Sequence, residues 1–210
     1  GRRRVRDLKR IIRSRLRRGF TLSVKKLLQT KEVKRLFSTA EFDQAKARLG
    51  QGYFSAGRDA WALQWAGQAA ERSGDVLPEA HWTAGLAAWR LKKVDVAAAH
   101  FEAVADNPKV SSWLKSAGAF WAARAHLVNR RPERVNPYLQ KAATDSRTFY
   151  GLLANYMLGE PMNFRWAVPP LGDETISQLA TTPRGQRAMA LLQIGENRRA
   201  ERELKTLSTF

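Results

Sequence analysis

The stretch HWTAGLAAWRLKKVDVAAAHFEAVADNP, residues 81–108, decides the fold of this chain. Its first part carries small and large apolar residues that recur at helical spacing: Ala84, Gly85, Leu86, Ala87, Ala88, Trp89 and Leu91. The small residues among them let a second backbone approach closely. Lys92 and Lys93 interrupt the apolar run and predict a tight turn, and Asn107 with Pro108 predicts the end of a second helix. The stretch therefore predicts a helical hairpin, the unit of an α-solenoid.

The same pattern returns in degenerate form elsewhere in the chain. Each hairpin has small residues in its first helix, then a turn, then alanine with an aromatic residue or leucine. The four sets are Gly57, Ala60 and Trp65; Gly85, Ala97 and Phe101; Gly118, Trp121, Tyr138 and Ala142; and Ala188, Leu191, Gly195, Ala200 and Leu204. The spacing drifts between about thirty and about forty residues, so the repeats are irregular. No strand alternation is present. The predicted fold class is all-α, an α-solenoid or superhelix of degenerate TPR-like helical hairpins.

The chain is expected to divide into a basic helical arm at residues 1–36 and an α-superhelical domain at residues 37–210. Ser38 with Glu41 predicts a helix start. The helix that follows is expected at residues 42–49, ending near Gly50 and Gly52. Residues 158–182 are rich in aromatic residues and proline and predict a connector held against the solenoid, with a short helix at 175–179. Residues 183–210 are the last predicted hairpin.

The charge of the chain is concentrated at its beginning. Residues 1–36 hold fifteen Lys and Arg against Asp7 and Glu32, a net charge of +13. The other 174 residues hold 22 basic and 17 acidic side chains, a net charge of +5, which completes the +18 of the whole chain. A basic arm on a nearly balanced body favours an anionic partner. The alternative is that the charge only solvates a terminal helix.

The arm itself is an amphipathic basic helix by its pattern. Its apolar residues follow helical spacing at Val5, Leu8, Ile11, Ile12, Leu16 and Phe20. Such a helix binds an anionic membrane or nucleic acid, or it packs its apolar stripe on the next hairpin. The candidate contacts to an anionic partner are Arg2, Arg3, Arg4, Arg6, Arg10 and Arg13.

No catalytic constellation is visible in the sequence. His81, His100 and His126 have no metal-ligand spacing and are interpreted as structural. The chain has no Cys, which excludes disulfides and thiolate metal sites. Phosphate-binding and dinucleotide-binding motifs are absent, and the acidic residues stand among Arg and Lys instead of in an apolar cleft. The sequence predicts no catalytic residue, no metal site and no cofactor.

The middle of the chain carries an unusual number of aromatic residues. On the concave face of a solenoid, aromatic rings with nearby arginines are suited to hold a sugar polymer or a peptide. The candidate binding residues are Trp121, Arg124, Arg147, Tyr150 and Trp166. Tryptophan at helical spacing among alanines is also typical of interhelical packing, so both interpretations stand at this point.

Four stretches in order carry a family resemblance: HWTAGLAAWRL, FWAARA, TFYGLLANYMLGEPM and RAMALLQIGENRRAERELKTL. They are similar to the superhelical, non-catalytic region of the soluble lytic murein transglycosylases, over residues from about 36 to 207. The resemblance implies a periplasmic α-superhelix that positions murein glycan strands for a catalytic domain following it in the family. That domain carries a Glu directly before a Ser, a pair that this sequence lacks. The resemblance therefore implies a scaffold region of a peptidoglycan lyase whose catalytic domain lies outside residues 1–210.

The second hypothesis belongs to another class of protein. It is a helical-repeat adaptor whose basic arm binds nucleic acid, an anionic membrane or a protein partner. Binding through the arm is expected to weaken steeply with salt, because phosphate neutralisation releases counterions. Murein binding through aromatic contacts is expected to depend less on salt.

Overall fold

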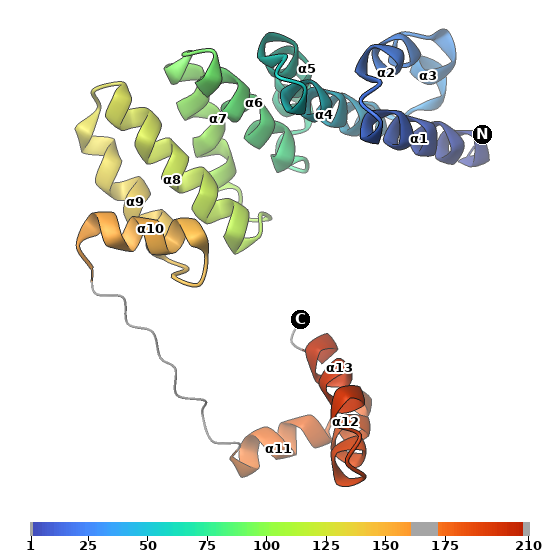
Figure 1. Ribbon diagram of the computed structural model, residues 1–210, viewed down its shortest axis with the longest axis vertical. Helices are drawn as coiled ribbons and strands as arrows, with labels where there is room; N and C mark the ends of the chain where they lie inside the picture. The colour runs from blue at the N-terminus through green and yellow to red at the C-terminus, as the bar shows by residue number, and fades with distance from the viewer. Residues whose placement is uncertain (1, 161–171, 208–210) are drawn as a thin grey trace. The chain divides into compact units, whose positions relative to one another are not determined.

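The computed structural model describes residues 2–160 and 172–207, and these residues form thirteen α-helices, one 3₁₀ turn and no strand (Figure 1). The predicted all-α class is confirmed. The chain divides into two compact units, Gly1–Met162 and Asn163–Phe210. The division falls inside the predicted connector. No helix within the described residues combines the length and hydropathy needed to cross a bilayer.

The elements of the first unit are α1 (Arg2–Arg17), α2 (Thr21–Leu28), α3 (Lys31–Leu36), α4 (Thr39–Ser55), α5 (Asp59–Ser73), α6 (Pro78–Arg90), α7 (Val94–Asp106), α8 (Ser112–Val128), η1 (Pro132–Arg134), α9 (Val135–Ala143) and α10 (Phe149–Leu158). In Figure 1 the helices of the first unit follow one another from α1 at the right of the view to α9 and α10 at the left. From α4 onward each helix packs against the next, and α4 also contacts α6, as α8 contacts α10. This pairing of neighbours and of alternate helices is that of a stacked hairpin array.

The hairpin predicted from residues 81–108 is α6 and α7, joined by a turn in which Lys92 adopts a positive φ of 61°. Gly85 lets the two helices approach, because a Cβ atom there would lie 2.7 Å from the Phe101 ring. Gly118 plays the same part between α8 and α7, since its Cβ would lie 2.7 Å from Val104. Glycine inside these helices serves close packing at the known cost in helix propensity.

The expected end of the fourth helix near Gly50 is wrong. The capping box predicted at Ser38 and Glu41 is present and starts α4, but the helix continues to Ser55. Gly50 is a packing position, because its Cβ would lie 2.8 Å from the backbone nitrogen of Ala66 on α5. The turn comes at Gly57, with φ of 71°, where the sequence also predicts one, so in the repeat pattern this residue belongs to the turn and not to a first helix.

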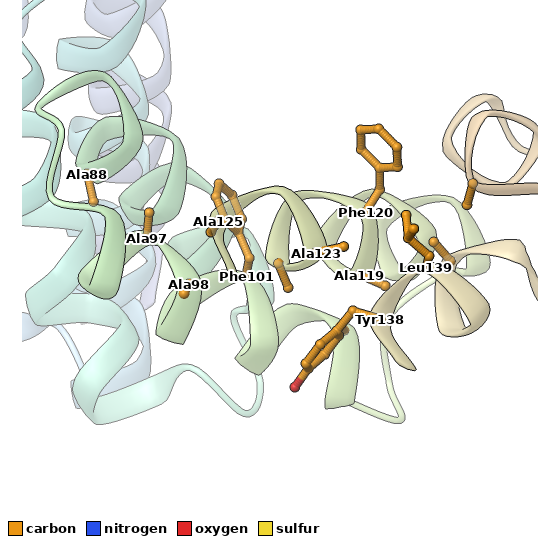
Figure 2. Close-up of a cluster of buried hydrophobic side chains, with 14 residues drawn as sticks. Ala88, Ala97, Ala98, Phe101, Ala119, Phe120, Ala123, Ala125, Tyr138 and Leu139 are labelled. Carbon is orange, nitrogen blue, oxygen red and sulfur yellow. The ribbon is translucent and has the colours of Figure 1, made fainter. Parts of the chain in front are cut away.

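Alanine dominates the larger core of the first unit. Figure 2 shows Ala88, Ala97, Ala98, Ala119, Ala123 and Ala125 along the helices of this core, with Phe101 among them and the rings of Phe120 and Tyr138 pointing to opposite sides. Short side chains bring the helices close, and the few large rings fill the spaces that remain, which keeps the interior dense.

The apolar stripe of α1 is buried in a second core. Leu8 and Ile12 are almost fully buried, in one cluster with Leu28, Leu49 and Tyr53. Of the interpretations for this amphipathic helix, packing of its stripe on the next hairpin is therefore the one that the contacts support. Residues 2–36 share a core with α4.

The second unit contains α11 (Asp173–Ala180), α12 (Pro183–Gln193) and α13 (Asn197–Leu207). Thr182 caps α12, and Gly195 turns the chain into α13 with φ of 77°. Ala188 and Ala200 are buried between these two helices. The last predicted hairpin is thus present within residues 183–207.

Candidate functional site

A basic groove lies between α1 and α4. It has a volume of about 850 Å³, and four arginines line it with neutral and apolar residues: Arg10, Arg13, Arg17 and Arg48, with Leu16, Gly19, Gln51, Gly52, Ser55 and Ala56. None of the residues that line it is acidic. We call this groove the arginine groove, after the four arginines that line it.

Helix geometry explains why α1 presents arginine to this groove. At 3.6 residues per turn, five arginines fall within roughly 80° of one another around the axis: Arg3, Arg6, Arg10, Arg13 and Arg17. The buried residues Leu8 and Ile12 lie on the opposite side. Because the apolar side is buried, the arginine stripe faces outward. Its later part, Arg10, Arg13 and Arg17, lies beside α4, which supplies Arg48.

The acidic residues near α1 each pair with a basic side chain, and only one of these, Arg10, belongs to the groove. Arg10 lies 3.1 Å from Asp7, Arg4 lies 2.7 Å from Glu32, and Lys9 lies 2.7 Å from Glu41. The hydrogen bond from Arg4 lowers the pKa of Glu32. Within the described residues, Arg13, Arg17 and Arg48 have no ion pair. Three guanidinium groups are therefore available to an anion.

The six predicted arm residues take different positions. Arg10 and Arg13 line the arginine groove, whereas Arg2, Arg3 and Arg6 are exposed elsewhere on α1. Arg4 is held by Glu32. Sequence reasoning missed two residues of the groove. The periodic stripe was sufficient to find Arg17, but Arg48 is distant in sequence and joins only through the packing of α4 on α1.

A second candidate surface is a cluster of aromatic rings between α6 and α8. The rings of Trp89 and Trp121 meet edge to face with centroids 5.3 Å apart, and Phe101 lies 5.7 Å from Trp121. The guanidinium of Arg124 lies 4.8 Å from the Trp121 centroid and 5.4 Å from that of Trp89. These distances fit cation–π contacts. Arg124 is itself exposed, so its N–H groups remain available above the two rings.

The other predicted binding residues lie at the start of α10. The ring of Tyr150 is 5.3 Å from Phe120 and 5.1 Å from Phe149. Arg147 is exposed and pairs with Asp145 at 3.3 Å. Tyr150 and Trp121 pack against the same hydrophobic core. Trp166, the fifth predicted residue, lies outside the described residues.

Histidine side chains make two partly buried interhelical contacts. The Nδ1 atoms of His81 and His100 are 2.9 Å apart, so one ring donates and the other accepts. Burial lowers the pKa of His81, and it lowers that of His100 to about 4 with a further contribution from the nearby His81. Each ring is therefore neutral near pH 7.

The buried His126 contacts Glu102 on the neighbouring helix. Its Nε2 atom lies 2.7 Å from the Glu102 carboxylate, which Arg134 also contacts at 2.7 Å. Burial, followed by the charges of Glu102 and Asp106, raises the pKa of Tyr138 to about 12. Within the described residues, no group of three or more His, Cys, Asp or Glu could hold a metal ion.

No protein-family model and no curated protein matches this chain. A similar solved structure is that of a candidate kinesin light chain from Podosopora anserina with nearly identical TPR-like repeats. The TM-score is 0.50 at 13% sequence identity, with 98% of this chain and 94% of that chain covered. At this identity the similarity concerns the fold alone. The chain is an all-α protein of TPR-like helical repeats.

Proposed function

We propose that this chain is the scaffold that positions peptidoglycan in a periplasmic murein lytic transglycosylase. The observation that carries the proposal is where the stretches of the family resemblance fall. HWTAGLAAWRL lies on α6, FWAARA lies on α8, and TFYGLLA begins α10. The first two are the first helices of the hairpins α6–α7 and α8–α9, and they supply the rings of Trp89 and Trp121, while α10 packs on α8 and α9.

This arrangement is suited to binding a glycan rather than to cleaving one. Aromatic rings offer apolar contact to sugar rings, and a few polar groups orient the ligand. Arg124 supplies such a group, because its guanidinium lies within cation–π distance of both indoles and can donate to hydroxyl or carboxylate oxygens. The bond cleavage itself belongs, in this proposal, to a catalytic domain outside residues 1–210.

The test is binding of the full chain to isolated murein sacculi, measured by co-sedimentation. Arg124→Ala is expected to weaken binding about tenfold, because a charged hydrogen bond contributes roughly 1.5 kcal/mol or more. Trp113→Ala is the matched control, since Trp113 is also on α8 and is 62% exposed. Absence of sedimentation, or equal losses in the two variants, would count against the proposal.

A second candidate function has its own observation, the arginine groove. We infer that the chain is, in this case, a helical-repeat adaptor that docks on an anionic partner through α1 and α4. Three unpaired guanidiniums on a concave surface support it. Replacement of these arginines by glutamine is expected to weaken binding and to flatten its dependence on salt. An undiminished salt dependence would contradict the adaptor function.

A further inference from the structure

We propose that the arginine groove and the adjoining turn between α1 and α2 form a docking site for an anionic phospholipid surface. The proposal rests on the second candidate function and names the partner of the same site. Its basis is the combination of unpaired arginines with exposed apolar side chains at one end of the first unit.

The buried apolar stripe of α1 determines which face of this helix can contact a membrane. A free amphipathic helix lies in the interface with its apolar face in the acyl region. In α1 the apolar face is not available to a membrane, because Leu8 and Ile12 are buried in the protein core. The helix therefore offers its arginine stripe to the headgroups while the protein holds it in place. Docking then depends on phosphate contacts and on whatever apolar groups lie beside the groove.

The turn after α1 supplies those apolar groups. Gly19 lines the groove and reverses the chain with φ of 78°. Phe20 follows it and is 47% exposed, and Leu22 is 54% exposed. The guanidinium of Arg18 lies 4.8 Å from the centroid of the Phe20 ring. An aromatic ring and an aliphatic side chain among cations is the composition of a membrane-interface contact, where apolar groups enter the headgroup boundary.

The same features favour lipid over nucleic acid. Single-stranded nucleic acid is bound by rows of aromatic rings that stack on successive bases. Here Phe20 is the one aromatic residue of the first 36, and Arg18 lies over its ring. Leu22 gains nothing from a polyanion in water but gains burial at a bilayer surface. The groove, at about 850 Å³, has room for a headgroup.

The groove is chemically matched to a phosphate ester. Arg13, Arg17 and Arg48 have no acidic partner within residues 2–160 and 172–207 and present planar pairs of donors. Gln51 and Ser55 of α4 add neutral hydrogen-bonding groups along the same wall. Because the arginines come from two helices, the site depends on the folded packing of α1 on α4.

The experiment is co-flotation of the full chain with vesicles of phosphatidylcholine, with and without phosphatidylglycerol. The first variant combines Arg13→Gln, Arg17→Gln and Arg48→Gln and is expected to lower affinity for the anionic vesicles about a hundredfold, at roughly one tenfold step or less per charge. Its control removes three exposed charges elsewhere, Lys92→Gln, Lys93→Gln and Lys109→Gln, and is expected to change affinity only a few-fold.

A second variant tests the apolar part, and far-UV circular dichroism confirms that all variants are folded. Phe20→Ser with Leu22→Ser is expected to weaken vesicle binding about tenfold and to leave binding to a DNA duplex unchanged. Equal affinity for both vesicle types, or equal loss in the two triple variants, overturns the proposal. Tighter binding to the duplex than to anionic vesicles also overturns it and leaves the adaptor function standing. Binding to neither also overturns the lipid proposal and restricts the adaptor function to an anionic protein partner, whereas the murein test contains no lipid and is independent.

Discussion

Substitution of Gly50 by alanine tests the packing that holds the hairpin array together. The new methyl group would lie 2.8 Å from both the backbone nitrogen and the Cβ atom of Ala66 on α5. A side-chain end can rotate away from such a contact, but a backbone atom of a neighbouring helix cannot. The helices α4 and α5 must therefore separate, or the methyl group stays compressed.

The expected magnitude has two opposing parts. Overpacking of a dense core costs about 1–3 kcal/mol, and a backbone contact places Gly50→Ala near the upper value. Replacing glycine by alanine inside a helix returns about 1 kcal/mol. The net loss in the free energy of unfolding is about 2 kcal/mol, which lowers the melting temperature of a unit of this size by about 4–8 °C.

The assay is urea unfolding followed by far-UV circular dichroism, with Gly67→Ala as the matched control. Gly67 lies on α5, and a Cβ atom there would meet nothing within 4 Å. This control is expected to stabilise the protein by about 0.5–1 kcal/mol, because it gains helix propensity without a clash. If Gly50→Ala proves as stable as Gly67→Ala, the reasoning about close approach is refuted.

Two further predictions concern buried polar groups. The pKa of His100 falls from 6.5 to about 4 on folding, so on acidification the unfolded chain takes up the proton first. Lowering the pH from 6.5 to about 4 is therefore expected to remove about 3 kcal/mol from the free energy of unfolding. In His100→Gln, the free energy of unfolding measured with urea is expected to depend less on pH across this range. An unchanged pH dependence would refute the assignment. Asp43 is fully buried, and its carboxylate accepts hydrogen bonds from the Arg72 guanidinium at 2.5 Å and from the Ser73 hydroxyl at 2.6 Å. Asp43→Ala is expected to cost about 2 kcal/mol in the same assay, whereas an unaltered unfolding curve would show that these bonds contribute nothing net.

The secondary structure could be predicted from the sequence wherever the signal is local. The turn at Lys92, the capping box at Ser38 and the helices on both sides of residues 91–93 follow from neighbouring residues alone. At Gly50 the same local reasoning predicts a helix end that is not there. A glycine in sequence signals either a stop or a close approach, and only the position of Ala66 distinguishes the two.

The candidate site was predicted only in part, for the same reason. The arginine stripe of α1 repeats every three to four residues, so Arg10 and Arg13 were predictable candidates. Arg48 stands 31 positions after Arg17, and no spacing rule links them. Likewise the pair of His81 and His100 has no sequence signature, although the two rings come within hydrogen-bonding distance.

The sequence by itself thus determined that the chain is all-α, where its central hairpin turns and where its positive charge is concentrated. These properties follow from helical periodicity, capping and composition, which act over a few residues. Only the tertiary structure decided that α1 packs on α4, that Gly50 meets Ala66 and that Arg48 completes the groove. Such contacts depend on the approach of whole helices, and that approach is set by all the side chains between them at once.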